Sequence, residues 1–180
     1  MGKPAIEIEV DDATGRWTVD TLPMILVPQH FFLNNHLAVE AALGPERLSE
    51  VLRPAGHRSA HYWCEREAAY HHLDGPAVFR HYLRRLSQRG WAQFSILSLE
   101  PGAGRAELRV DHSCFVDEAR RRSGRKLCYM FASWFEGALD YVNSSAGERR
   151  PTVGREVHCA AEGEHDHCHF RVEPAASDAR

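Results

Sequence analysis

Four residues in the last third of the chain have side chains and spacing suited to binding a metal ion. Glu156 and Cys159 are three residues apart, Cys168 follows an acidic loop, and Cys128 lies upstream in an expected helix. Two thiolates on opposite sides of a tight hairpin turn can reach one ion, because the turn holds both sulfur atoms near a common point. Four protein ligands would close a tetrahedron around Zn²⁺, so the ion would be structural. Iron is a second candidate, since thiolates bind both metals.

Alternation along the expected closing hairpin indicates which of its residues point inward. Cys168 shares a strand face with apolar residues, whereas His167 and His169 occupy the opposite face. On a regular strand Glu156 and Cys159 would face opposite ways, so Glu156 can join the cysteines only at a bulge or an early strand end. Spacing alone leaves a second interpretation open, in which the cysteines are free thiols buried in the core.

A second group of metal-ligating residue types lies earlier in the chain. His61, Cys64, His71 and His72 fall within one expected helix, and several of them share a face. Such a group could form a further metal or catalytic centre. The alternative interpretation is that these histidines are solvated side chains on an exposed helix.

The elements that position these residues follow from the hydrophobic periodicity. Apolar residues alternate in three hairpins and recur at helical spacing between them. The expected hairpins cover residues 6–19, 93–110 and 155–173, and the expected helices cover 34–43, 45–54, 59–72, 76–89 and 126–142. This order predicts a single α+β domain in which antiparallel hairpins pack against several helices. We divide it into an N-terminal hairpin and helical part (1–89), a core with the metal motif (90–174) and a disordered tail (175–180).

The composition excludes several classes of protein. A chain of 180 residues has the length of one domain, and its net charge of -3 with a pI near 6.4 argues against a nucleic-acid partner. No apolar run approaches the length of a membrane span, and the first residues lack the apolar region of a signal peptide. We therefore expect a cytoplasmic protein without a membrane partner. Its five cysteines are then thiols or metal ligands, in agreement with their odd number.

Two segments of the chain resemble the 4-vinyl reductase domain family. The run Lys126–Phe131 followed by Gly137 is similar to that family's helix, which a cysteine opens. The run Glu156–Ala160, with Gly163 and then Cys168–Val172, resembles its closing signature, and the match covers about residues 90–174. The loop before Cys168 is one residue longer than in the family pattern, so His165 or His167 is an alternative ligand.

The resemblance implies a ligand-binding fold shared with bacterial aromatic-sensing regulators and with Golgi transport (TRAPP-like) subunits. It also implies that Cys128, Glu156, Cys159 and Cys168 bind zinc beside an effector pocket, and that the protein forms a homodimer through its helices. The N-terminal half resembles a stand-alone branch of the family that is associated with the breakdown of methylated amines such as glycine betaine.

Three functions remain open on these grounds. The first, which we favour, is a sensor-like module that binds a small molecule in an apolar pocket above the metal. The expected lining residues are His112, Cys114, Phe131, Trp134 and Trp63, although aromatic residues at helical spacing are also typical of an ordinary core. The second is an enzyme or accessory subunit of an oxidoreductase system, for which the chain offers no cofactor-binding motif. The third is an assembly scaffold without an enclosed pocket.

Overall fold

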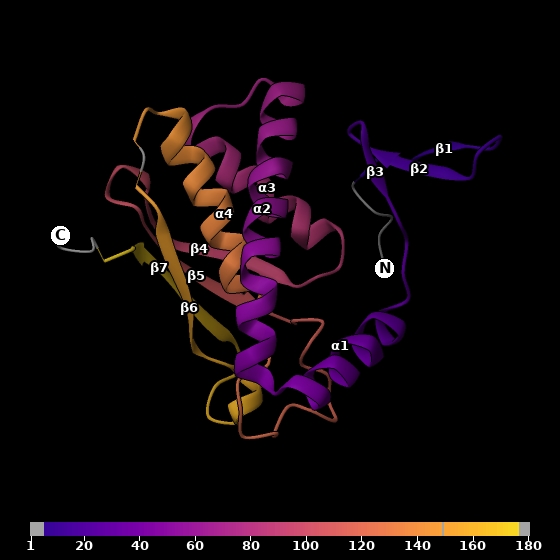
Figure 1. The fold of residues 1–180 in the computed structure, drawn as a ribbon, viewed down its shortest axis with the longest axis vertical. Coiled ribbons are helices and arrows are strands. Elements are labelled where there is room, and N and C mark those ends of the chain that lie inside the picture. The colour runs from indigo at the N-terminus through magenta and orange to yellow at the C-terminus, as the bar shows by residue number, and fades with distance from the viewer. Residues whose placement is uncertain (1–5, 149, 177–180) are drawn as a thin grey trace.

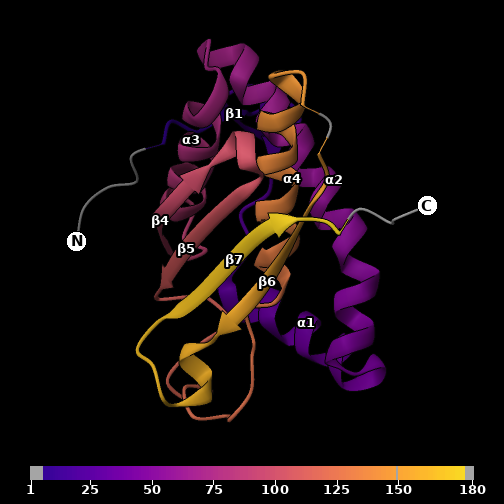
Figure 2. The ribbon, with the colours of Figure 1, turned by 90° about the vertical axis from the view of Figure 1, so that its left-hand side faces the viewer.

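A four-stranded antiparallel sheet with helices packed on one of its faces forms the centre of the protein (Figures 1 and 2). The computed structural model describes residues 6–148 and 150–176. The central strands lie in the order β4-β5-β7-β6, and a three-stranded sheet in the order β1-β2-β3 lies to one side of the helices (Figure 1). The elements are β1 (Glu9–Asp11), β2 (Arg16–Val19), β3 (Leu22–Met24), α1 (Gln29–Leu43), α2 (Pro45–His71), α3 (Gly75–Gln88), β4 (Gln93–Glu100), η1 (Pro101–Ala103), β5 (Arg105–Asp111), α4 (Met130–Ser145), β6 (Thr152–His158), η2 (Ala160–Glu162) and β7 (Cys168–Pro174). The predicted single α+β domain is confirmed.

The register of the central sheet carries one of the candidate ligands into the interior. Ala106, Leu108 and Val110 of β5 are buried, and their alternation continues onto β7, where Phe170 lies opposite Leu108 and Cys168 opposite Val110. Because side chains alternate along a strand, this register places Cys168 on the buried face. The inward orientation predicted for Cys168 is therefore confirmed.

Helix α4 covers the buried face of the sheet and makes close contact with β6. Gly154 has no side chain, and a Cβ atom there would lie 2.7 Å from the carbonyl oxygen of Ala132. The amide of Gly154 donates a hydrogen bond to the Glu136 carboxylate at 2.7 Å, and Arg53 of α2 forms an ion pair with the same carboxylate. This helix begins at Met130 instead of the predicted Lys126, and the backbone amide of Cys128, before the helix, donates to the Glu156 carboxylate at 3.2 Å.

One long helix, α2, replaces the two helices predicted on either side of Pro54. An internal proline removes a backbone hydrogen bond and costs about 3 kcal/mol. Here the helix contacts α4 on both sides of the proline, through Arg53 before it and through Gly56 and His57 after it. We attribute the continuity of α2 to this packing, which local sequence rules cannot detect.

The N-terminal sheet contacts the helices through the turn between β2 and β3. Asp20 and Thr21 form this turn with φ angles of 52° and 69°, which are left-handed conformations uncommon for residues other than glycine. The Asp20 carboxylate forms an ion pair with Arg85 of α3 and lies 3.5 Å from Nε2 of His71. The predicted N-terminal hairpin is thus extended by a third strand and fixed to α2 and α3.

Helix α1 begins at Gln29, earlier than predicted. The side-chain Nε2 atom of Gln29 donates to the carbonyl oxygen of Cys114 at 2.8 Å, and this bond connects α1 to the segment between β5 and α4. No helix in the described part of the chain is both long enough and apolar enough to cross a membrane. Residues 177–180 of the predicted tail lie outside the described residues.

An ion pair between α2 and α4 gives a pH-dependent contribution to stability. Nε2 of His57 lies 2.9 Å from the Asp140 carboxylate, and this hydrogen bond raises the pKa of His57. A group with a raised folded-state pKa stabilises the protein below its unfolded pKa, about 6.5, and this contribution is lost as the pH rises through the folded pKa. We expect His57→Gln to lower the free energy of unfolding more at pH 5.5 than at pH 9, as measured by urea denaturation.

The control is His61→Gln. His61 lies one turn after His57 in α2, and its imidazole packs on Tyr141 of α4. A loss of stability for His57→Gln that is equal at both pH values would show that the ion pair does not contribute.

Candidate metal centre

The structure brings the sulfur atoms of Cys128, Cys159 and Cys168 together in the interior. The Cys168 sulfur lies 3.5 Å from that of Cys159 and 3.6 Å from that of Cys128, and the remaining pair is 3.9 Å apart. Zinc–sulfur bonds are about 2.3 Å long, so two sulfurs of a tetrahedral site are separated by about 3.8 Å. The three observed distances bracket this value, and all three cysteines are buried.

Glu156 completes the group because β6 is irregular at this point. The pairing of β6 with β7 shifts register between Glu156 and His158, which is the bulge that the sequence required. The carboxylate is 8% exposed, and its Oε2 accepts the hydrogen bond from Cys128. Its Oε1 is buried and has no hydrogen-bond partner among the residues that the structure describes. A buried carboxylate oxygen without a donor is costly, and a cation bound between it and the sulfurs would satisfy it. The donor set therefore fits a zinc ion.

Three different elements hold the sulfur atoms in place. Cys159 precedes the short helix η2, and its backbone amide donates to the Glu162 carboxylate at 2.6 Å. Cys168 is the first residue of β7, and its sulfur accepts a hydrogen bond from the amide of Ala160 at 3.3 Å. Cys128 lies in the segment before α4, where its thiol donates to the Ser113 hydroxyl at 3.0 Å. Hydrogen bonds with residues of three separate segments thus hold the site.

The cysteines and the carboxylate strongly perturb one another. The thiols of Cys128 and Cys168 stabilise a thiolate at Cys159 and lower its pKa, while the same contact with Cys159 raises the pKa of Cys128. Burial raises the pKa of Glu156, and the charge of Cys159 raises it further. Metal ligands must be deprotonated, so a divalent ion bound here would displace the protons of the cysteines.

The residues predicted to line one pocket do not all lie together. Phe131 and Trp134 contact each other with ring centroids 5.2 Å apart. Cys114 is buried, and its backbone amide donates to the carbonyl oxygen of Trp91, whose ring contacts Trp134. Trp63 lies elsewhere, against His81 and Tyr82. The prediction that His112 points into the apolar side of the hairpin is wrong. β5 ends at Asp111, and His112 adopts a left-handed φ of 52° that turns its side chain outward, where it is exposed.

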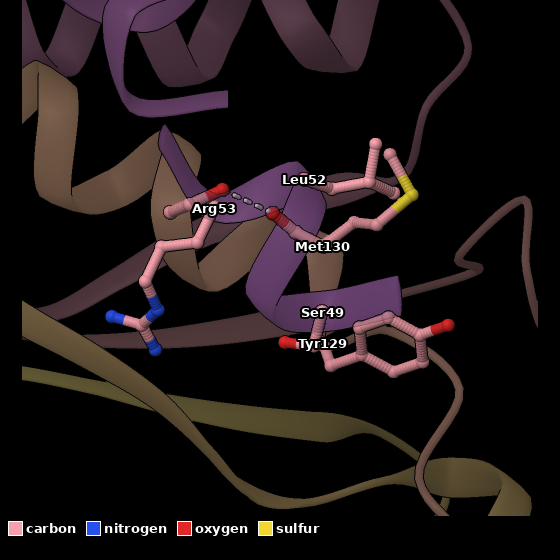
Figure 3. Close-up of a pocket in the computed structure, with 6 residues that line it drawn as sticks. Ser49, Leu52, Arg53, Tyr129 and Met130 are labelled. Atoms are coloured by element: carbon pink, nitrogen blue, oxygen red, sulfur yellow. Dashed lines mark hydrogen bonds between the residues drawn. The ribbon is translucent and has the colours of Figure 1, made fainter. Parts of the chain in front are cut away.

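Two small hollows lie near the start of α4 and under α1. Each has a volume of about 10 Å³, which is room for about one water molecule. Figure 3 shows the first, between α2 and the start of α4, where Arg53, Met130 and Tyr129 surround it. The second lies under α1. Its lining includes His36, Glu40, Phe115 and Leu127. Neither hollow is large enough for an aromatic ligand in this conformation.

A polar group that the sequence did not indicate lies between α2 and α3. Glu67 is fully buried, with its Oε2 2.8 Å from Nε2 of His81 and 3.5 Å from Nε2 of His71. Arg84 donates to Nδ1 of His81 at 2.9 Å. Because an arginine can only donate, Nδ1 of His81 is the acceptor, and its Nε2 carries the proton given to Glu67. We interpret this group as a hydrogen-bonded network that joins α2 to α3.

The predicted second centre does not assemble as a unit. His71 joins the Glu67 network, and His61 packs on Tyr141. Cys64 is buried, and burial raises the pKa of its thiol, whereas His72 ends α2 in a left-handed conformation. Helical spacing placed these residues on one helix, but their partners come from different elements.

Sequence comparison places the chain in a family. The model of a family described as "Domain of unknown function (DUF5943)" matches residues 2–97. The chain belongs to this family. The DUF5943 match includes β1 to α3 and most of β4, so it ends before the four residues of the metal centre. A comparison with curated proteins gave no match. Membership in the 4-vinyl reductase domain family stays a prediction.

Two solved structures share the fold of this DUF5943 protein. The phenol-responsive sensory domain of the transcription activator PoxR, solved with phenol, has a TM-score of 0.74 and 19% identity, covering 93% of this chain and 84% of that domain. A trafficking protein particle complex subunit 3 from Naegleria fowleri, covalently bound to palmitic acid, has a TM-score of 0.52 and 12% identity, covering 82% of this chain and 90% of that subunit. These are the two classes of relatives that the sequence predicted.

Proposed function

We propose that this protein is a sensor-like domain that binds a small molecule and holds a structural zinc ion through Cys128, Glu156, Cys159 and Cys168. The observation that carries the proposal is the convergence of three sulfurs at tetrahedral spacing with the buried Glu156 carboxylate. The fold shared with a phenol-responsive sensory domain supports the binding role. Four protein ligands leave no open position at the metal, so the ion would stabilise the domain without binding the effector.

The aromatic residues next to the metal centre are the best candidates for an effector pocket. Trp134 meets Trp91 edge to face with ring centroids 4.9 Å apart, and Phe131 lies between Trp134 and Phe115. Such a group offers an apolar wall for an aromatic ring, and its faces suit a quaternary ammonium group. Polar atoms of His36 and Glu40, which belong to α1, lie at the edge of this region.

Admission of a ligand to this region requires side chains to move. The Tyr129 hydroxyl, beside the first hollow, donates to Glu40 of α1 at 2.7 Å, and Arg125 pairs with the same carboxylate at 2.6 Å. These bonds fasten the segment before α4 to α1. We propose that this segment and α1 separate to admit the ligand, which would order them again when bound.

Thermal-shift and calorimetric measurements with phenol and with glycine betaine test the proposal. We expect one of them to raise the melting temperature, and Trp134→Ala to weaken its binding at least tenfold by removing part of the aromatic wall. Trp17→Ala, in the N-terminal sheet, serves as the control and should leave binding unchanged. Binding by neither compound, nor by other aromatic or methylated-amine compounds, would contradict the proposed role.

The homodimer implied by the family resemblance is a separate part of the proposal. Native mass spectrometry of the untagged protein measures the subunit number and the bound metal in one experiment. A dimer with one zinc ion per chain supports both parts, and a monomer contradicts the dimer without affecting the metal centre.

An assembly subunit is the second candidate function, favoured by the fold shared with the trafficking complex subunit. In that role the chain would bind a protein partner and neither phenol nor glycine betaine. The ligand measurements therefore separate the two candidates.

A further inference from the structure

Four histidines surround the end of the β6–β7 hairpin, on the side away from the cysteines. The rings of His158 and His165 stack with centroids 3.8 Å apart, and His167 and His169 lie within 5.4 Å of His158. His158 precedes Cys159, and His167 precedes Cys168, so alternation sends the sulfurs inward and these imidazoles outward. His165 is exposed, and His158 and His167 are partly exposed.

Two of these rings face each other at the spacing of metal ligands. Nε2 of His158 lies 3.3 Å from Nε2 of His167. Zinc–nitrogen bonds of about 2.0 to 2.1 Å give a separation of about 3.3 to 3.4 Å between two ligands of a tetrahedral site. The two nitrogens therefore need little movement to bind one ion.

The hydrogen bond to Asp166 fixes the tautomer of a neutral His167 ring. Nδ1 of His167 lies 2.7 Å from the Asp166 carboxylate, which can only accept, so the proton is on Nδ1. Nε2 is then a lone pair that faces His158. A carboxylate that orients the other ring nitrogen is the usual outer partner of a metal-binding histidine.

Two carboxylates lie close to the four histidines. The carboxylates of Asp166 and Glu107 lie beside this group, with Glu107 3.3 Å from Nε2 of His169, and would offset the charge of a bound ion.

We propose that His158 and His167 bind a second divalent transition-metal ion on the surface, separate from the buried cysteine centre. Imidazole ligands suit Zn²⁺, Ni²⁺ and Cu²⁺, whereas the buried thiolates favour softer metal ions. His165, whose ring stacks on that of His158, supplies a third ligand after rotation of its side chain, and water fills the open positions. The ion is exchangeable because the ligands are partly exposed and incomplete.

Zinc titration of the untagged, full-length protein tests this site. Its resident metal is first counted by elemental mass spectrometry, and Zn²⁺ is then added in a calorimeter. We expect one further equivalent to bind. The double variant His158→Ala/His167→Ala should lose that equivalent and keep the resident metal, and His30→Ala on exposed helix α1 is the matched control. Uptake of no further zinc by the natural protein, or equal uptake by the double variant, overturns the proposal.

Asp166→Asn separates a metal site from a pair of hydrogen-bonded imidazoles. Asp166 is 79% exposed at its side chain, so its replacement should not affect folding. Loss of an outer carboxylate partner typically costs 10- to 100-fold in metal affinity, and we expect a loss in this range. An unchanged zinc affinity would show that Asp166 does not orient His167 for metal binding, and it would contradict the assigned tautomer.

This inference does not depend on the proposed zinc centre. Cys159→Ser should abolish the resident metal and leave the further equivalent, which is lost only with the histidines. Absence of a resident metal with retention of the further equivalent would contradict the buried centre alone.

Discussion

Cys159→Ser is expected to abolish the resident zinc and to lower the melting temperature by about 8 to 16 °C. A ligand present at 1,000 times its dissociation constant stabilises the folded state by about 4 kcal/mol. For a domain of this length, 1 kcal/mol corresponds to about 2 to 4 °C. A hydroxyl group is a poor substitute for a thiolate, and Cys159 is the cysteine whose pKa the other two lower. Calorimetric melting and elemental analysis of the same sample measure both effects.

Cys114→Ser is the matched control for this experiment. Cys114 is 8% exposed and is not among the four residues that converge. Its replacement makes the same chemical change in a buried position, so it should keep the full metal content and cause a smaller loss of stability. Equal melting temperatures for the natural protein and Cys159→Ser would show that the cysteines are ordinary core thiols.

Local patterns in the sequence were sufficient to predict the part of the fold that surrounds the metal centre. Alternation in β5 and β7 gave the buried face and the inward direction of Cys168, because a strand's side chains depend only on its own pleat. The same rule showed that Glu156 could join the cysteines only through an irregularity, and β6 has its register shift at that place. Cys128 was proposed as a third sulfur from its place in an expected helix, and the family resemblance assigned it as a ligand; the structure places it in the segment before α4.

Features that depend on contacts between distant residues were not predicted. The continuity of α2 through Pro54 rests on packing against α4, and the burial of Glu67 rests on His81 of another helix. His112 was misplaced because alternation was extended beyond Asp111, where the backbone changes to a left-handed conformation. The facing nitrogens of His158 and His167 were missed for a similar reason, since alternation indicates only that both side chains point outward.

Gly137→Ala is expected to cause the largest loss of stability among single changes in the helices. A Cβ atom at this position of α4 would overlap the carbonyl oxygen of His57 in α2 and would lie 2.9 Å from its carbonyl carbon. Backbone atoms of two packed helices cannot move aside individually, so α2 and α4 would have to separate.

Two opposing contributions to the free energy of unfolding decide whether Gly137→Ala stabilises or destabilises the protein. Alanine is favoured over glycine inside a helix by about 1 kcal/mol, whereas overpacking costs about 1 to 3 kcal/mol and sometimes more. We expect the clash to dominate, because the atoms that it meets belong to backbone, and the free energy of unfolding to fall by at least about 2 kcal/mol. Urea denaturation of the purified variant measures this change.

Gly56→Ala distinguishes a backbone clash from a general sensitivity of this helix pair. A Cβ atom at Gly56 would meet the side chains of Ser133 and Trp134, which can change rotamer. The loss should therefore be smaller than for Gly137→Ala, although both glycines lie where α2 crosses α4. A Gly137→Ala protein as stable as the natural one would mean that α2 and α4 are farther apart than described. The aromatic group beside Trp134 would then have more room for a ligand than the two small hollows provide.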